Sequence, residues 1–264
     1  MMTPPQIAEI DSTSHSAPLV AILGRVDLGV NGDMETIETP YGQVEAVMSS
    51  LGGVPILLIS RHGKDRLPPH RVNYRALVAA AALAKARRLI SVNTVGSMSP
   101  IPGSFFLPDD FVEFTKARPN TFFEDRATHV GMSRPYCPQI QEALGHGLEK
   151  AGAAASRGVY VCTEGPHLET PAQIRMLSQY GDVVGMTGYP EVVLAREMCL
   201  CYASLCLITN QASGLAEGPL SARDVGETTE RLAPVIRQIL EEAIVRLPVE
   251  RRCSCHRALD DAHI

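Results

Sequence analysis

The sequence lacks an excess of basic residues, since 24 Lys and Arg stand against 29 Asp and Glu and the formal net charge is −5. A chain of this charge offers no basic surface to nucleic acid or to an anionic membrane, so we expect neither as a partner. It also lacks an apolar run of the ~18–20 residues that a membrane-spanning helix needs, and its N-terminus does not have the pattern of a signal peptide. We therefore expect a cytoplasmic protein.

Cysteine is present, but not in a pattern typical of a metal site or a disulfide framework. Seven cysteines are an odd number, unlike the even sets of small secreted proteins. There is no H-E-x-x-H motif, no C-x-x-C pair and no G-x-S-x-G motif, so we expect no metal and no serine-hydrolase site. The cysteines in or beside apolar segments are expected to be small buried side chains: Cys137, Cys162, Cys199, Cys201 and Cys206. Cys253 and Cys255 lie in a polar C-terminal segment rich in Arg and His.

Short apolar runs alternate with helical patterns along the chain. Six runs rich in β-branched residues predict buried strands, at 19–23, 55–60, 89–95, 158–162, 183–186 and 203–209. Helices are predicted at 73–88, 138–151, 171–180, 190–200 and 221–247, and Pro234 predicts a kink or a join in the last one. This alternation is typical of an α/β fold, and we expect a single domain with a mixed, largely parallel central sheet flanked by helices. The expected boundaries are a flexible tail at 1–18, the domain at 19–247 and a C-terminal tail at 248–264.

Polar and glycine residues follow each predicted strand, at 24–27, 61–63, 93–96, 163–166, 186–188 and Asn210. Ligands of open α/β sheets bind at the carboxyl ends of the strands, so we expect a ligand site there. Arg61, His62 and Thr187 offer the donors that suit phosphate. Glu169 and Asn210 offer donors and acceptors for the edge of a purine base. No nucleophile paired with a general base is evident, so the attacking group is expected to be a bound anion or water.

Several motifs closely resemble the trimeric purine nucleoside phosphorylases and methylthioadenosine phosphorylases. They lie at 164–170, 184–193 and 208–210, with further matches to the methylthioadenosine branch at 61–63, 72–75, 93–96 and 135–138. The resemblance covers roughly residues 19–246. It implies the nucleoside phosphorylase fold and a pentosyltransferase that uses phosphate as co-substrate and no cofactor. The implied reaction releases a purine base and a ribose-1-phosphate.

The resemblance also implies a role for individual residues. The implied phosphate ligands are Arg61, His62, the backbone at Asn93 and Thr94, and Thr187, and Arg25 is a further candidate from the loop that departs from the family pattern. The implied substrate-binding residues are Leu168, Glu169, Met186, Asn210, Ala212 and His129, of which His129 reaches the ligand of a neighbouring subunit. Asn210, His62 and Arg61 are the candidates for direct catalysis.

A homotrimer is part of the same implication. In the family's arrangement, Phe122 and Phe123 lie near a neighbour's site. The alternative is that these two rings fill the core of their own chain.

Base preference follows from two side chains. Adenine-specific relatives carry Asp at the position of Asn210, because a carboxylate accepts from a 6-amino group, whereas an amide also donates to a 6-oxo group. Glu169 resembles the carboxylate that accepts from N1–H of a 6-oxopurine. Adenine has no N1–H, and leaving the carboxylate unpaired costs about 1–3 kcal/mol. The residues therefore favour hypoxanthine or guanine.

The 5′ substituent is predicted from the segment after Asn210, which most resembles the bacterial S-methyl-5′-thioinosine phosphorylases. No histidine lies between Asn210 and Leu247 to meet a 5′-hydroxyl. We expect 5′-methylthioinosine, with inosine and guanosine as alternatives.

The first phosphate loop departs from the family pattern, because Val26 and Asp27 replace a hydroxyl residue and a glycine. Losing one hydrogen bond to a charged group costs about 1.5–3 kcal/mol, whereas Arg25 supplies a new cation. Three alternatives follow: a phosphorylase that holds phosphate through Arg25 and Arg61, a nucleoside hydrolase-like enzyme that uses water, and a purine-binding homologue without catalysis.

Cys253 and Cys255 resemble the Cys-x-Cys pair of some heat-stable archaeal members. Such a pair closes a small, strained and easily reduced disulfide. Two free thiols are the alternative.

Overall fold

The computed structural model describes residues 20–24, 27–99, 104–216, 218 and 220–263. The predicted tail at 1–18, Arg25 and Val26 lie outside the described residues. Within the described part the strands are β1 (Val20–Gly24), β2 (Asp33–Thr39), β3 (Gly42–Leu51), β4 (Val54–Ser60), β5 (Arg88–Ser97), β6 (Phe105–Phe114), β7 (Ala155–Thr163), β8 (Val183–Gly185) and β9 (Cys201–Gln211). The helices are η1 (Pro69–Arg71), α2 (Tyr74–Leu83), α3 (Pro138–Lys150), α4 (Pro171–Leu177), α5 (Gly188–Glu197), α6 (Ala222–Arg246) and η2 (Ser254–Arg257).

The strands form one mixed sheet in the order β2-β3-β4-β1-β5-β8-β7-β6-β9. β9 also pairs in parallel with β5, so one half of the sheet closes on itself through β5, β8, β7, β6 and β9. β4, β1, β5 and β9 run parallel to one another, and their carboxyl ends therefore meet at one edge. The predicted α/β class with a mixed, largely parallel sheet is confirmed.

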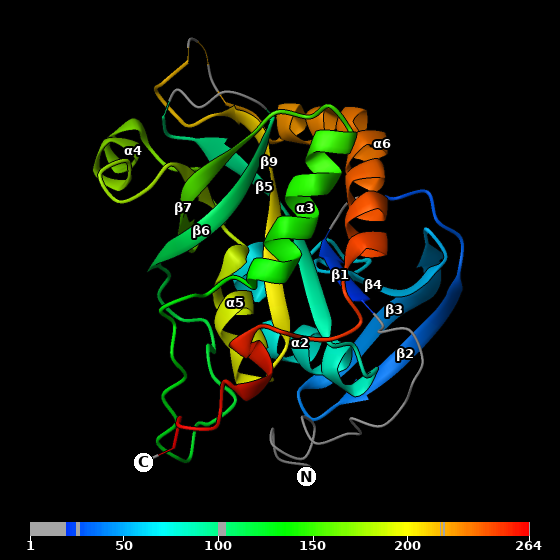
Figure 1. Cartoon of the computed structure of the whole chain (residues 1–264). Helices are drawn as coiled ribbons and strands as arrows, with labels where there is room; N and C mark the ends of the chain where they lie inside the picture. The colour runs from blue at the N-terminus through cyan, green and yellow to red at the C-terminus, as the bar shows by residue number, and fades with distance from the viewer. Residues whose placement is uncertain (1–19, 25–26, 100–103, 217, 219, 264) are drawn as a thin grey trace.

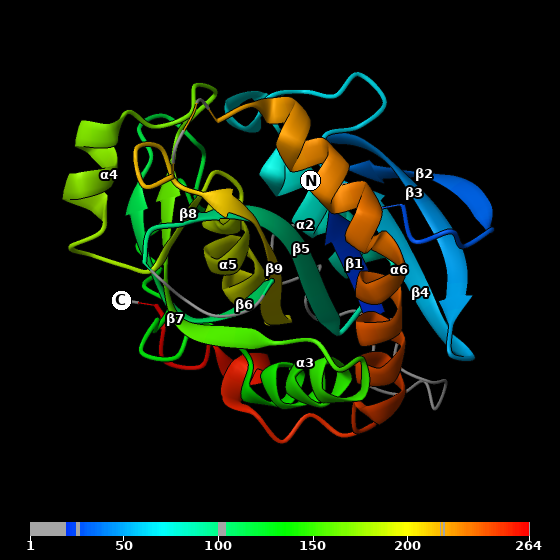
Figure 2. The ribbon, with the colours of Figure 1, turned by 90° about the horizontal axis from the view of Figure 1, so that it is seen from above.

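Helices pack on the sheet in two groups (Figures 1 and 2). α3 and α6 pack against each other and against β9, whereas α2 and α5 pack together elsewhere on the sheet. Each group has its own cluster of buried apolar side chains. Gly147 of α3 lies where the first pair crosses, since a Cβ there would be 2.3 Å from the carbonyl oxygen of Ile239 in α6. Only glycine allows this approach.

All six predicted strands are present, and the differences from prediction have local causes. The helix predicted at 73–88 ends at Leu83, because Lys85 takes a left-handed φ of 62° and Arg88 begins β5. β2, β3 and β6 were not predicted, and the residues of β2 are mostly exposed and form no apolar run. α6 continues through Pro234 as one helix and changes direction along its length (Figure 1). No helix of the described residues is long and apolar enough to cross a membrane.

The C-terminal segment at 248–263 folds back onto the domain. In Figure 1 the red chain after α6 passes below the lower end of α3. Cys253 and Cys255 are buried there, beside and within η2. Further on, the N–H of His129 donates to the carbonyl oxygen of Ala262 at 2.7 Å. A segment with a polar composition therefore contributes buried side chains to the core.

Candidate active site

A pocket of about 410 Å³ lies at the edge where the parallel strands end. Ten of the residues predicted from the sequence line it: Arg61, His62, Asn93, Thr94, Leu168, Glu169, Met186, Thr187, Asn210 and Ala212. They come from the ends of β4, β5, β8 and β9 and from the loop before α4. The fold thus brings together residues spread over about 150 positions of the sequence. His129 does not line this pocket, and Arg25 lies outside the described residues.

Arg61 is a buried cation at the base of the pocket. Its Nε donates to Oε1 of Glu191 at 2.5 Å, and Nη2 donates to Oγ of Ser91 at 2.6 Å. Nη1 donates to the carbonyl oxygen of Val92 at 3.0 Å. Burial alone would lower the pKa of Arg61, but the carboxylate of Glu191 outweighs it and the pKa is raised. The guanidinium is held rigidly, and the second N–H of Nη1 is the donor available to a ligand.

Glu191 is the counter-ion that the sequence analysis missed. Its side chain is fully buried in α5, and it also accepts from Oγ of Ser91 at 2.6 Å and from the hydroxyl of Tyr202 at 3.0 Å. The sequence does contain a signal for this role, because Glu191 is an acidic residue at the start of the apolar stretch after Pro190. A carboxylate in a buried segment is rarely left unpaired, so a cationic partner could have been expected.

Thr187 and Asn93 form a buried polar pair. Oγ1 of Thr187 donates to Oδ1 of Asn93 at 2.8 Å, and Nδ2 of Asn93 donates to Oγ of Ser204 at 3.1 Å. The backbone N–H of Thr187 donates to the hydroxyl of Tyr160 at 3.2 Å. The side chain of Asn93 is therefore engaged within the protein, and its place at the pocket is consistent with a backbone contribution beside Thr94.

Asn210 and Glu169 line the pocket from other elements, and neighbours orient both side chains. Nδ2 of Asn210 donates to the carbonyl oxygen of Gln211 at 2.8 Å, and its Oδ1 accepts from Thr209 Oγ1 at 2.7 Å. Oε1 of Glu169 accepts from Thr163 Oγ1 at 2.6 Å. One amide N–H of Asn210 and Oε2 of Glu169 are the groups that these bonds leave for a ligand.

Arg118 is a second buried arginine that the sequence did not reveal. Its Nη1 donates to the carbonyl oxygens of Met186 at 2.6 Å and Tyr189 at 2.8 Å. Its Nη2 donates to those of Thr163 at 3.2 Å and Glu164 at 2.7 Å. One guanidinium thus ties the loop after β7 to the loop after β8, which makes Arg118 a positioning residue.

Phe122 and Phe123 are buried within their own chain. The ring of Phe122 packs on Tyr41 with 5.2 Å between centroids, and that of Phe123 packs on His263 with 5.9 Å. The alternative reading of these rings, that they fill their own core, is the arrangement observed. His129 is exposed at the surface.

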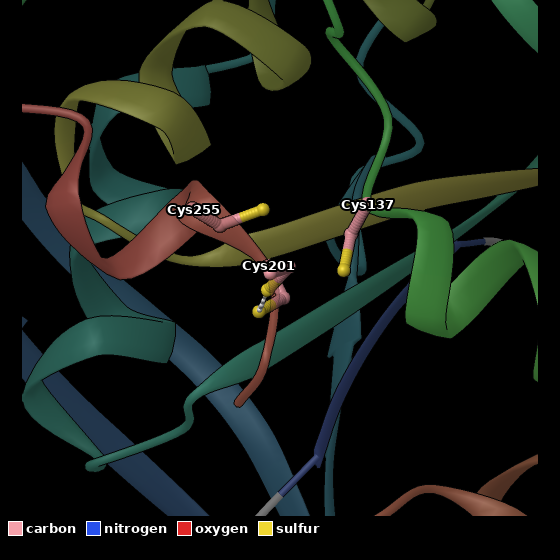
Figure 3. Close-up of side chains that lie close together, drawn as sticks. Cys137, Cys201 and Cys255 are labelled. Carbon is pink, nitrogen blue, oxygen red and sulfur yellow. Dashed lines mark hydrogen bonds between the residues drawn. The ribbon is translucent and has the colours of Figure 1, made fainter. Parts of the chain in front are cut away.

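A separate group of side chains lies at the opposite end of β9. The four Sγ atoms of Cys137, Cys201, Cys253 and Cys255 all lie within 4.8 Å of one another (Figure 3). All seven cysteines are free thiols, so the disulfide between Cys253 and Cys255 is not formed in this structure. The four residues come from segments that no spacing motif connects, so the absence of such motifs from the sequence does not bear on this group.

The fold and the pocket define an α/β protein that binds its ligand at the carboxyl ends of parallel strands. Residues 19–245 match the Phosphorylase superfamily, and the chain belongs to this family.

Its relatives have purine-related names. The chain is 48% identical to a probable S-methyl-5′-thioinosine phosphorylase of Methanosarcina acetivorans over 92% of this chain and 96% of the relative. It is 38% identical to a 6-oxopurine nucleoside phosphorylase of Pyrococcus furiosus over 93% and 99% of the two chains. A solved methylthioadenosine phosphorylase from an Antarctic soil metagenomic library has a TM-score of 0.86 at 33% identity, covering 94% of this chain and 93% of that one.

Proposed function

We propose that the chain catalyses the phosphorolysis of a 6-oxopurine nucleoside, with 5′-methylthioinosine as the preferred substrate. The products are the free base and the corresponding ribose-1-phosphate, which makes the enzyme a pentosyltransferase. One observation carries the proposal: a single pocket combines Arg61, His62, Thr94 and Thr187 with Glu169 and Asn210, in a member of the phosphorylase family.

The catalysis is electrostatic. As the glycosidic bond breaks, the ribose develops positive charge and the purine leaves with negative charge. A phosphate held by Arg61, His62, Thr187 and the backbone at Asn93 and Thr94 stabilises the ribose and attacks it. Inorganic phosphate is therefore the co-substrate, and Met186 packs beneath the sugar.

The leaving base is stabilised at the other end of the pocket. The second amide N–H of Asn210 donates to N7 or O6 of the purine, since its other N–H is occupied by Gln211. Oε2 of Glu169 accepts from N1–H, while Thr163 holds Oε1. Adenine would meet this carboxylate with an acceptor, so the arrangement favours 6-oxopurines.

The first turns of α6 support a 5′-methylthio group. Leu220, Ala222, Val225 and Gly226 give the pocket an apolar lining there, and Thr229 and Glu230 line it further along the helix. An apolar lining is suited to a thioether, because burying one methylene-sized group stabilises binding by about 0.8 kcal/mol. The sequence analysis missed these residues, because it searched this segment only for histidine.

The alternative of a hydrolase or of a binding protein without catalysis has one observation in its favour. Most donors of Arg61 are already used by Glu191, Ser91 and carbonyl oxygens. The carboxylate of Asp27, by contrast, accepts from the N–H of Gly29 at 2.8 Å and does not line the 410 Å³ pocket. Asp27 instead lines a second cavity, of about 620 Å³, that Arg61 also lines.

Purine release with and without phosphate tests the proposal. Chromatography of reactions with 5′-methylthioinosine, inosine, guanosine and 5′-methylthioadenosine should show release only with phosphate, fastest for 5′-methylthioinosine. Release at the same rate without phosphate would establish a hydrolase. Binding of hypoxanthine with no turnover of any nucleoside would establish the non-catalytic homologue.

A homotrimer and a cytoplasmic location belong to the same proposal. The exposed position of His129 is consistent with a contact to a neighbouring subunit's ligand, and free thiols are typical of a reducing compartment. Light scattering should give a mass of three chains, and a mass of one chain would contradict the trimer.

A further inference from the structure

Four cysteines from three parts of the chain meet at the end of β9 that lies away from the pocket. Cys137 is the N-cap of α3, Cys201 begins β9, and Cys253 and Cys255 belong to the segment that contains η2. All four side chains are buried. Figure 3 shows Cys137, Cys201 and Cys255 gathered where these elements converge. The Sγ atoms of Cys201 and Cys253 lie in contact with each other.

The spacing of the sulfurs fits a single tetrahedral metal ion. Every Sγ–Sγ distance is at most 4.8 Å, and that between Cys201 and Cys253 is 3.4 Å. Zn–S bonds of about 2.3 Å in a tetrahedron place the sulfurs roughly 3.8 Å apart, which lies between these two values. A disulfide requires about 2.05 Å. An iron–sulfur cluster would set several iron and sulfide atoms between the four thiolates and needs a wider group.

A buried arginine beside the group lacks the partners that such a centre would provide. Arg88 is fully buried and lies opposite Cys201 in the register between β5 and β9. Among the described residues, its Nε and Nη1 have no hydrogen-bond partner, while Nη2 donates to the carbonyl oxygen of Pro248. Unpaired donors on a buried cation are costly, which indicates an anionic partner at this place.

We propose that Cys137, Cys201, Cys253 and Cys255 bind one zinc ion as four thiolates. Binding forms four Zn–S bonds and releases the four thiol protons to solvent, leaving a centre of charge −2, since four thiolates oppose one Zn²⁺. The guanidinium of Arg88 then pairs with the thiolates, and the helix dipole at the N-terminus of α3 favours the thiolate of Cys137. Zinc needs no redox partner.

The site is structural rather than catalytic. All four positions around the ion are filled by the protein, so none remains for a substrate or water. β9 runs from Cys201 to Gln211, so the ion is separated from Asn210 by almost the full length of that strand. Zinc would fasten the C-terminal segment to the sheet and to α3. The proposal does not depend on the reaction assigned to the pocket.

Metal analysis of the full-length protein tests this site directly. Protein purified with reductant should contain one zinc per chain by inductively coupled plasma mass spectrometry. After chelation, cobalt titration should give one equivalent with the visible bands of tetrahedral Co²⁺ and the near-ultraviolet bands of thiolate charge transfer. Cys255→Ser should lower zinc affinity by tenfold or more, and Arg88→Met by about 10- to 100-fold, as for other outer-shell partners.

Cys199→Ser is the matched control, because Cys199 lies two residues before Cys201 and is not one of the four. It should keep the full zinc content. If Cys255→Ser does not fold, the cobalt titration of the unaltered chain decides. Reduced protein that takes up neither zinc nor cobalt overturns the proposal, as does an equal loss of metal in Cys199→Ser. Iron bound with the same dependence on the four cysteines overturns the assignment to zinc.

Discussion

Two buried arginines lie near opposite ends of β1, Arg61 at the pocket and Arg88 at the cysteine group. Arg61 has a carboxylate partner in Glu191 and further acceptors around it, and its pKa is raised. Arg88 has one carbonyl partner, and burial lowers its pKa. The two guanidinium groups are thus buried in different environments, one with a carboxylate partner and one without.

The difference teaches where the chain supplies its own counter-charge and where it does not. At the pocket, the carboxylate of Glu191 balances the charge of Arg61 before any ligand binds. The guanidinium is therefore held in place without a ligand. At the cysteine group, the anions that the described residues can supply are thiolates, which form at neutral pH when a metal replaces the thiol protons. The first region is preorganised, and the second becomes so on metal binding.

The largest expected effect comes from removing the counter-ion at the pocket. Glu191→Ala should lower the free energy of unfolding by about 3–5 kcal/mol, because it leaves Arg61 as an unpaired buried charge. Urea denaturation measures this value. Glu227→Ala is the control, since Glu227 pairs with Arg223 on an exposed face of α6 and should cost less than about 0.5 kcal/mol. A loss below about 1 kcal/mol in Glu191→Ala would show that Arg61 does not need this partner.

Metal removal should have the next largest effect on stability, and it should act at the cysteine group without changing the pocket. A ligand at one hundred times its dissociation constant stabilises a folded protein by about 2.7 kcal/mol, which for a domain of this size corresponds to roughly 5–11 °C in Tm. Chelation should lower Tm by such an amount in differential scanning calorimetry and leave hypoxanthine affinity unchanged. A loss of ligand affinity in step with Tm would show that the two regions are coupled.

Base selectivity gives a smaller effect confined to the pocket. Asn210→Asp should shift the ratio of hypoxanthine to adenine affinity toward adenine by roughly 10- to 150-fold, the equivalent of about 1.5–3 kcal/mol for one charged hydrogen bond. Glu169→Gln should weaken hypoxanthine, because the amide loses the charge-assisted bond to N1–H. Calorimetric titration measures both affinities. Folded variants that keep the original ratio would show that these two residues do not read the base.

The smallest effect concerns Glu197, a buried carboxylate that forms no ion pair within the described part of the chain. Burial raises its pKa, although it accepts from the N–H of Phe122 at 2.6 Å and from Thr121 Oγ1 at 2.7 Å. The folded state therefore holds this proton to higher pH than the unfolded chain does. The resulting contribution to stability is fully present below the ordinary Glu pKa and is lost as the pH rises through the raised folded value.

Glu197→Gln removes this titration. The variant should lose less stability than the unaltered chain between pH 4 and 7, a window set by the usual pKa of about 4.3 and its raised folded counterpart. At pH 7 it should differ by about 1 kcal/mol, because the single amide oxygen can accept from the N–H of Phe122 while the amide nitrogen has to donate to Oγ1 of Thr121. Urea midpoints across this pH range supply the comparison, and parallel curves for the two proteins would contradict the assignment.

Much of the pocket was predictable because its residues follow strands that are recognisable locally. An apolar run ending at Ser60 places Arg61 at a strand end whatever the rest of the chain does, and the same holds for Asn210 after β9. Residues in exposed or irregular segments were harder. Arg118 lies between β6 and α3, where no periodic pattern marks it, and its role depends on carbonyl oxygens some 45 to 71 positions away.

The sequence by itself determined the α/β class, the six buried strands and ten of the residues that line the pocket. These depend on hydrophobic periodicity and on the rule that parallel strands share one carboxyl edge. Only the tertiary structure decided that Arg61 pairs with Glu191, 130 positions away, and that Cys201 meets Cys253, 52 positions away. Such partners come together only when the sheet closes and the C-terminal segment folds back, and no local pattern in the chain encodes a contact between segments so far apart.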